Sequence, residues 1–271
     1  MNDFPEPSGG LFEGAAWHYA RYRPDYPQVF IDDLVARYQL DGTGRLLDLG
    51  CGTGQLAIPL AAHVAEVIGL DPEPGMLTEA ARCAEEAGVT NTVWHQAGST
   101  DLPGEFGRFR MVTMGRSFHW MDREQVLLSL DAMVDRHGVI VLANDSCLIR
   151  PTTPWQQSVE AIQYRYLPPQ QLPADTLPGR LDTPADHQPH DDFLANSPFP
   201  QVNRSIYEFI RQWTTHQVIG YLYSTSLPLR RLLGNRRADF EQEVADTLRP
   251  LEPHGLLEPV RLEVFTATRA S

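Results

Sequence analysis

A glycine-rich segment, residues 45–56, constrains the fold of this chain more than any other part. A short apolar run ends in three glycines at alternate positions, Gly50, Gly52 and Gly54, and a helical pattern follows. Glycines allow backbone conformations that a side chain would block, and they let a ligand approach the main chain closely. The segment therefore predicts a strand, a tight turn and a helix.

A second apolar run, residues 67–70, ends in Asp71, and this acidic residue indicates that the turn binds a ligand. In doubly wound folds an acid at this point commonly hydrogen-bonds ribose hydroxyls. The glycine spacing is G-x-G-x-G, and Asp48 stands two residues before it, whereas a dinucleotide-binding turn has G-x-G-x-x-G. A nicotinamide-binding turn stays the rival interpretation, and a glycine turn without any ligand is the third.

The D-x-G-x-G-x-G segment, Asp48 to Gly54, together with Gly69-Leu70-Asp71, resembles the class I S-adenosylmethionine (SAM) dependent methyltransferases. The chain is similar to their small-molecule branch, the trans-aconitate methyltransferase or methyltransferase type 11 group. The resemblance is good over residues 12–144 and loose over residues 202–268. It implies an α/β fold with a Rossmann-like seven-stranded sheet, mostly parallel with an antiparallel last strand, plus an inserted lid. It also implies SAM as the cofactor.

The same resemblance implies which residues bind the cofactor. Tyr19 and Arg23, in a Y-x-x-x-R-P-x-Y-P segment, would reach the methionine carboxylate, which a guanidinium can grip with two parallel hydrogen bonds. Aromatic packing of an N-terminal helix is the alternative for that segment. Ser99 and Thr100 would contact the adenine, with Asp101 as the alternative partner. Met76 would pack on the adenine, with ordinary core packing as the alternative. The full set of expected cofactor-binding residues is Tyr19, Arg23, Asp48, Gly50, Gly52, Gly54, Asp71, Pro72, Met76, Ser99, Thr100, Gly115 and Arg116.

The segment after the fourth expected strand, residues 115–120, carries the expected reactive groups. Ligands of open α/β sheets bind at the carboxyl ends of the strands, so His119 and Trp120 would face the reactive end of the cofactor. A histidine suits general-base work on a hydroxyl because imidazole titrates near neutrality. We therefore expect His119 to be catalytic, with packing beside Trp120 as the alternative. The expected substrate contacts are Trp17, Ser117 and Trp120.

Composition excludes several classes of function. A net charge of −13 repels a phosphate backbone, so we expect a small-molecule acceptor and no nucleic acid partner. The longest apolar run, residues 139–143, is too short for a bilayer, and residues 1–10 lack a signal-peptide pattern, so we expect a cytoplasmic protein without membrane contact. Cys51, Cys83 and Cys147 have no metal-ligand spacing, and we read the His- and Asp-containing stretch 186–192 as a solvated loop, so no metal is expected.

The remaining pattern predicts the order of elements in a single methyltransferase domain, residues 1–271. We expect a SAM-binding core over residues 28–144, an inserted proline-rich lid over 145–200 that is irregular after residue 167, and the C-terminal part of the core over 201–271. The expected helices cover residues 27–38, 55–65, 76–87, 122–135, 155–167, 214–224 and 235–248. The other expected strands cover residues 67–71, 93–97, 109–114, 138–143, 202–213 and 260–268. Pro59 predicts a kink or a late start for its helix.

These observations predict a SAM-dependent methyltransferase that acts on a hydroxyl or amine of a small metabolite. The acceptor would be a natural product or amino sugar of secondary metabolism, and the protein a monomer or homodimer. A carboxyl O-methyltransferase of a small acid is the alternative. A nicotinamide-dependent oxidoreductase and a non-catalytic SAM-binding protein are the alternatives from other classes.

Overall fold

A computed structural model describes residues 14–145, 152–167, 190–225, 227 and 229–270 of the chain. The chain divides into two compact units. We call residues 24–145, 186–207 and 262–271 the sheet unit, and residues 1–23, 146–185 and 208–261 the helical unit. Two long strands, residues 201–213 and 256–268, are divided between these units. The boundaries at residues 144 and 200 that we expected from the sequence stay a prediction.

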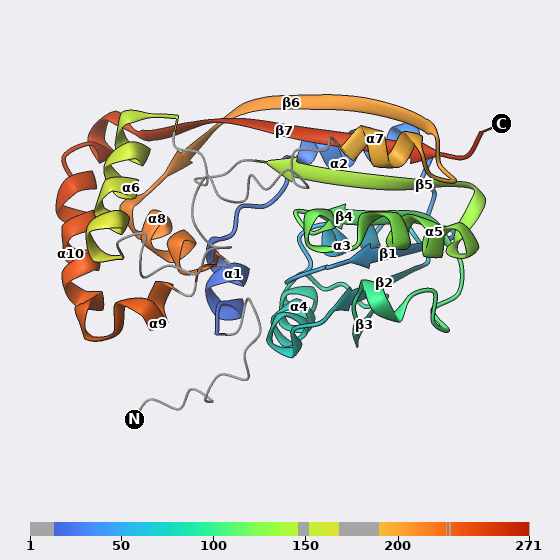
Figure 1. Ribbon diagram of the computed structural model, residues 1–271, viewed down its shortest axis with the longest axis horizontal. Helices are drawn as coiled ribbons and strands as arrows, with labels where there is room; N and C mark the ends of the chain where they lie inside the picture. The colour runs from blue at the N-terminus through green and yellow to red at the C-terminus, as the bar shows by residue number, and fades with distance from the viewer. Residues whose placement is uncertain (1–13, 146–151, 168–189, 226, 228, 271) are drawn as a thin grey trace. The chain divides into compact units, whose positions relative to one another are not determined.

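The sheet has seven strands in the order β3-β2-β1-β4-β5-β7-β6 (Figure 1). β1 pairs in parallel with β2 and β4, and β7 pairs antiparallel with β5, with Ile140 opposite Ala267. This confirms the Rossmann-like sheet with an antiparallel last strand. The strands are β1 Arg45–Leu49, β2 Glu66–Asp71, β3 Thr92–Gln96, β4 Phe109–Gly115, β5 Val134–Asp145, β6 Gln201–Trp213 and β7 Leu256–Thr268.

The helices of the sheet unit follow the sequence pattern closely. The helix after the glycine turn starts late and is short, as Pro59 predicts, because proline cannot donate a helical hydrogen bond. The side chain of Asp122 accepts a hydrogen bond from Gln125 N and so fixes the start of α5. The elements are α2 Gln28–Arg37, α3 Ala57–Ala61, α4 Pro74–Glu86, α5 Arg123–Met133 and α7 His190–Ala195, with short 3-10 helices η1 Ser99–Asp101 and η2 Phe118–Trp120.

Helix α7 is a departure from the prediction. We expected residues 168–200 to be irregular, and the described part of that stretch contains this helix instead. Leu194 and Phe199 are fully buried and join the core formed by β4, β5, β7 and α5. Because this stretch is rich in proline, we did not predict from the sequence that Leu194 and Phe199 are buried.

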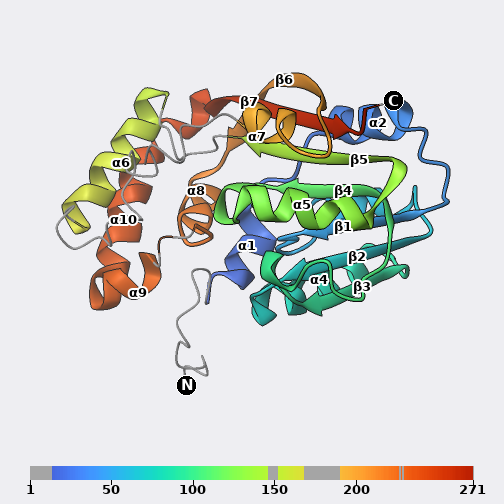
Figure 2. The ribbon, with the colours of Figure 1, turned by 45° about the vertical axis from the view of Figure 1, so that its right-hand side comes forward.

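The helical unit has its own hydrophobic core. α10 packs against α6 and α8, and α1 packs against α8 (Figure 2). A Cβ on Gly220 would lie 2.3 Å from the ring of Tyr22, so this close contact requires glycine. The helices are α1 Ala16–Tyr22, α6 Pro154–Tyr166, α8 Thr215–Leu222, α9 Leu229–Leu233 and α10 Arg237–Leu248. We did not predict α9. Among the helices described in either unit, each is too short or too polar to span a bilayer.

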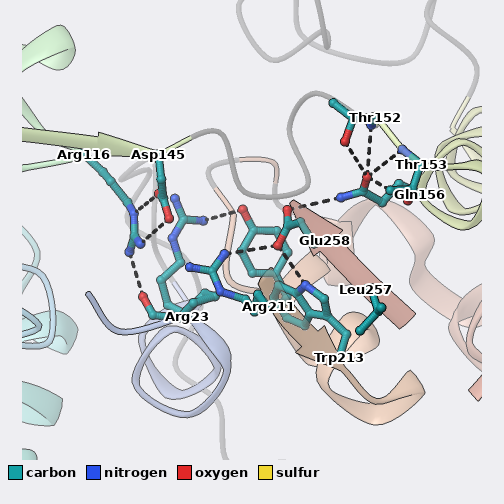
Figure 3. Close-up of polar contacts among 12 residues, drawn as sticks. Arg23, Arg116, Asp145, Thr152, Thr153, Gln156, Arg211, Trp213, Leu257 and Glu258 are labelled. Carbon is teal, nitrogen blue, oxygen red and sulfur yellow. Dashed lines mark hydrogen bonds and ion pairs between the residues drawn. The ribbon is translucent and has the colours of Figure 1, made fainter. Parts of the chain in front are cut away.

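A buried carboxylate joins three elements of the helical unit (Figure 3). Glu258 of β7 accepts hydrogen bonds from Arg211 at 3.1 Å and Trp213 at 2.8 Å, both on β6. It also accepts one from Gln156 at 3.2 Å, whose own oxygen accepts hydrogen bonds from Thr153 at the start of α6. These bonds satisfy the buried charge and fix α6 to the strand pair.

Candidate functional site

The glycine turn between β1 and α3 lies at the carboxyl end of the parallel strands. Gly50, Gly52 and Gly54 have φ values of 70°, 54° and 89°, in the left-handed region. Gly50 N donates to Leu70 O at 2.8 Å, which ties the turn to β2. A Cβ on Gly50 would lie 2.6 Å from the Cβ of Ser117, so only glycine fits there.

Asp71 holds this turn from the end of β2. One carboxylate oxygen accepts a hydrogen bond from Gly52 N at 2.9 Å, and the other accepts one from Glu73 N at 2.9 Å. The residue is 8% exposed, and burial raises the pKa of its carboxyl group. A carboxylate has about four lone-pair sites, so each oxygen keeps one acceptor position. The geometry suits the expected ribose contact, which stays a prediction.

Asp48 lies beneath the turn, and its two oxygens have partners inside the protein. It accepts hydrogen bonds from Thr113 Oγ1 of β4 at 2.7 Å and from Ala57 N of α3 at 3.2 Å. The residue is 2% exposed, and burial raises its pKa to about 7. The carboxyl group therefore connects β1, β4 and α3 around the turn, and a direct contact with the cofactor stays a prediction. Sequence reasoning missed Thr113, although a hydroxyl inside an apolar strand was a signal.

Trp94 of β3 supports the turn from the side, and sequence reasoning missed it too. A Cβ on Gly69 of β2 would lie 2.3 Å from the Trp94 ring, so the ring packs directly against that glycine. The same ring would be 3.3 Å from a Cβ on Gly54. A glycine inside a buried strand was the available signal, since it marks close approach of another group.

Arg116 follows β4 and forms a buried ion pair (Figure 3). Its guanidinium donates to both carboxylate oxygens of Asp145, at 2.6 and 2.9 Å, and to Pro24 O at 3.0 Å. Its φ is 54°, which is uncommon for a residue with a side chain. These contacts join the carboxyl ends of β4 and β5. The expected role of Arg116 in cofactor binding stays a prediction.

The next residues connect the end of β4 to the glycine turn. Ser117 Oγ donates to Leu49 O at 2.8 Å, and Tyr26 leaves no room for a side chain at Gly115, where a Cβ would lie 2.6 Å from its hydroxyl oxygen. His119 is half-buried on η2, with its ring centroid 4.9 Å from that of Trp120, which is 43% exposed. The structure thus brings the turn and the 117–120 segment together.

The remaining expected contacts are distributed more widely. In the sheet unit Pro72 is exposed, Met76 is buried in the first turn of α4, and Ser99 and Thr100 lie on η1. The Asp101 carboxylate accepts a hydrogen bond from Gly98 N at 2.7 Å, which fixes η1. Each of these cofactor contacts stays a prediction.

Three expected residues belong to the helical unit, namely Trp17, Tyr19 and Arg23. There, Arg23 donates to the hydroxyl of Tyr221 at 3.3 Å and lies 5.2 Å from the centroid of the Tyr19 ring. Arg21 lies over the ring of Trp17 at 4.3 Å. Their contacts with cofactor and substrate stay predictions.

The described ranges contain no group of three or more His, Cys, Asp or Glu side chains that could hold a metal ion. Residues 186–189 of the expected acidic loop, and Cys147, lie outside the described residues. Cys51 is buried in the glycine turn, and burial raises the pKa of its thiol.

Residues 46–138 match a family described as a methyltransferase domain. This window runs from β1 into β5 and contains the glycine turn, Asp71 and His119. A probable S-adenosylmethionine-dependent methyltransferase of Saccharomyces cerevisiae, CRG1, is 28% identical over 134 residues, covering 47% of this chain and 43% of the relative. The ubiquinone biosynthesis O-methyltransferase of Azorhizobium caulinodans is 32% identical over 127 residues, covering 46% of this chain and 49% of the relative. The chain thus spans about half the length of these curated relatives.

Solved structures show the same fold over most of the chain. A putative type II methyltransferase from Anaeromyxobacter dehalogenans has a TM-score of 0.56 at 22% identity, covering 92% of this chain and 98% of that one. The YcgJ protein of Bacillus subtilis has a TM-score of 0.53 at 15% identity, covering 90% of this chain and 100% of that one. The finer assignment to the trans-aconitate group stays a prediction. The chain thus contains a methyltransferase domain at residues 46–138, and it is similar in sequence and fold to S-adenosylmethionine-dependent methyltransferases.

Proposed function

We propose that this protein transfers a methyl group from SAM to a hydroxyl or amine of a small metabolite. The observation that carries the proposal is the glycine turn bonded to Asp71 at the carboxyl end of the parallel strands, within the matched methyltransferase domain. The Azorhizobium caulinodans relative is an O-methyltransferase by name, which favours a hydroxyl acceptor for this chain.

The residues of the sheet unit fit the cofactor. When bound, SAM supplies a methyl group on a sulfonium, which a nucleophile of the acceptor attacks in line. The glycine turn, residues 50–54, would hold the cofactor against its backbone, and Asp71 would accept hydrogen bonds from the ribose hydroxyls through its remaining lone pairs. Met76, Ser99 and Thr100 would surround the adenine.

The protein's part in the chemistry is mainly alignment. Holding two reactants in line can lower a barrier by about 7–11 kcal/mol in favourable systems, without a covalent enzyme intermediate. If the acceptor is a hydroxyl, we propose that His119 is the general base that removes the hydroxyl proton. For a carboxylate, the alternative acceptor, no base is needed and His119 would only orient the substrate.

We further propose a cytoplasmic enzyme of secondary metabolism, monomeric or homodimeric, whose acceptor is a natural product or an amino sugar. The net charge of −13 supports a small acceptor rather than a nucleic acid.

A labelled-methyl assay against a panel of metabolites tests the proposal. Mass spectrometry would locate the transferred methyl, and we expect it on an oxygen or nitrogen of one panel member. A methyl ester as the product would favour the carboxyl alternative. Binding of SAM without transfer to any member would favour a non-catalytic SAM-binding protein.

A further inference from the structure

A cleft lies at the amino ends of β4 and β5, on the edge of the sheet opposite the glycine turn. Its volume of about 620 Å³ falls within the roughly 300–1,000 Å³ that is typical of small-ligand sites. The end of α2, Arg110 of β4 and the first residues of β5 line it. Both strands run from this edge toward the carboxyl ends, where the turn lies (Figure 2). The cleft therefore lies within the sheet unit and apart from the expected cofactor site.

A long bulge at the start of β5 forms one wall of the cleft. Between two regular pairs of β4 and β5, Arg110 alone stands opposite residues 135–138. A Cβ on Gly138 would lie 3.0 Å from Arg110 O, so the glycine lets the bulge stay close to β4. Bulges redirect the side chains of a strand. Here the exposed side chains of Arg136 and His137 line the cleft from this bulge.

Arg110 fixes the opposite wall, which is the segment after α2. Its guanidinium donates to Tyr38 O at 3.2 Å and to Gln39 O at 2.6 Å. It also donates to the carboxylate of Asp41 at 2.6 Å. The side chains of Tyr38 and Gln39 line the cleft. Because these bonds hold the backbone that carries them, this wall is formed before a ligand binds.

Most charges around the cleft are compensated within the protein. The ion pairs are Arg37–Asp33 at 2.7 Å, Arg110–Asp41 at 2.6 Å and Asp135–Arg108 at 3.3 Å. Neither Arg136 nor His137 forms an ion pair or a side-chain hydrogen bond with any residue that the structure describes. Arg136 thus leaves one positive charge in the cleft, to which a protonated His137 would add. A cleft that carries an uncompensated charge attracts ligands of the opposite sign.

The groups that remain available favour a phosphate over a carboxylate. They are the guanidinium of Arg136, the imidazole of His137, the hydroxyl of Tyr38 and the amide of Gln39. A carboxylate has two acceptor oxygens, whereas a phosphate monoester has three and a charge of about −1.5 to −2 at neutral pH. The rings of Tyr38 and His137 also give the cleft an apolar surface for the organic part of a ligand.

We propose that this cleft is a second binding site, and that it takes a small organic phosphate. Arg136 donates hydrogen bonds to two phosphate oxygens, and Tyr38, Gln39 and His137 supply the other donors. The organic part packs against the rings of Tyr38 and His137. This inference goes beyond methyl transfer and does not depend on it, since none of these residues belongs to the expected SAM or acceptor site.

Four small probes test the chemistry of the ligand. Phenyl phosphate, benzoate and phenol carry a phosphate, a carboxylate and a neutral hydroxyl on the same ring, and inorganic phosphate lacks the ring. We would measure their binding to the full chain by calorimetry at neutral pH. Phenyl phosphate should bind at least about tenfold more tightly than each of the other three, a difference of ~1.4 kcal/mol.

Three results of this experiment would overturn the proposal. One is that phenyl phosphate does not bind. Another is that benzoate or phenol binds as tightly as phenyl phosphate, which would remove the preference for a phosphate. The third is that inorganic phosphate binds as tightly, which would remove the role of the rings.

Substitution of Arg136 tests the position of the site. Arg136→Gln removes the uncompensated charge and its donors, so phenyl phosphate should bind at least about tenfold more weakly. Arg231→Gln is the matched control, because Arg231 is also exposed, lies on α9 of the helical unit and has no ion pair within the described ranges. This control loses the same charge and should bind like wild type.

The two variants separate a local site from an effect of net charge. Unchanged affinity for phenyl phosphate in Arg136→Gln would overturn the proposal, and so would an equal loss in both variants. Both side chains are exposed, so we expect the melting temperatures of the variants to stay near that of wild type.

Discussion

The glycine turn and three other residues of the sheet unit, Asn144, His190 and Asp191, differ in how their polar groups are satisfied. Beneath and beside the turn, each carboxylate oxygen of Asp48 and Asp71 accepts a hydrogen bond from the protein. Asn144, His190 and Asp191 each have one buried polar atom without a hydrogen-bond partner. A network of hydrogen bonds that is already formed can bind a ligand without reorganisation of the protein, whereas a buried polar atom without a partner is energetically unfavourable. The satisfied hydrogen bonds of the turn therefore support the proposed cofactor site.

The largest expected effect is on stability and tests how tightly the turn's network is buried. The pKa of folded Asp48 is about 7, above the ordinary value of 3.8. Between these values the folded state keeps a proton that the unfolded state has lost, so stability falls as pH rises from about 4 to 7. Relative to Asp48→Asn, wild type should lose up to about 4 kcal/mol of unfolding free energy over this range. Parallel pH profiles for the two proteins would contradict a buried, protonated Asp48. Chemical denaturation at several pH values makes the measurement.

His119→Ala tests whether His119 acts as the general base in methyl transfer. A general base contributes about 10²–10⁴ to rate, so turnover should fall at least about 100-fold while SAM affinity stays within about twofold of wild type. Turnover with labelled SAM and calorimetry would be measured on the same preparation. Equal turnover in both forms would leave His119 as packing beside Trp120.

Gly50→Ala tests whether the glycine turn binds SAM. The new Cβ would meet Ser117 at 2.6 Å, so the turn must shift and SAM affinity should fall about 30-fold, or ~2 kcal/mol. Gly88→Ala is the matched control, because Gly88 has a φ of 68° with open space around it and shares only the backbone strain. Similar SAM affinities in the two variants would remove the steric argument for the turn.

Asp71→Ala removes the carboxylate that bonds to the turn and, by our proposal, to the ribose. SAM binding should weaken at least tenfold, since hydrogen bonds to a charged group contribute about 1.5–3 kcal/mol. Asp135→Ala, a surface carboxylate at the start of β5, serves as the control. An unchanged SAM dissociation constant in Asp71→Ala would show that the ribose binds elsewhere.

Local patterns in the sequence were sufficient for most of the sheet unit. Alternating or continuous apolar runs ended where the strands end, at Asp71 and after Met114, because buried parallel strands tolerate few polar residues. Pro59 correctly predicted that helix α3 starts late and is short. This effect is local, because it depends only on the missing backbone N–H of the proline itself. The position of the glycine turn followed from the same local reasoning.

Partners distant in the sequence could not be predicted in this way. Thr113 reaches Asp48 from the neighbouring strand β4, and Trp94 packs on Gly69 from the neighbouring strand β3. The local signals, a hydroxyl in an apolar strand and a glycine in a buried strand, did not identify these partners. Helix α7 depends on Leu194, whose burial is decided by the sheet beneath it. The unpaired atom of Asn144 is likewise visible only once its neighbours are in place.

Calorimetric titration of the full chain with SAM and, separately, with NADH tests the central claim most directly. The account predicts saturable binding of SAM to one site per chain and no detectable binding of NADH. Binding of NADH without binding of SAM would contradict it, and would assign the glycine turn and Asp71 to a nicotinamide cofactor.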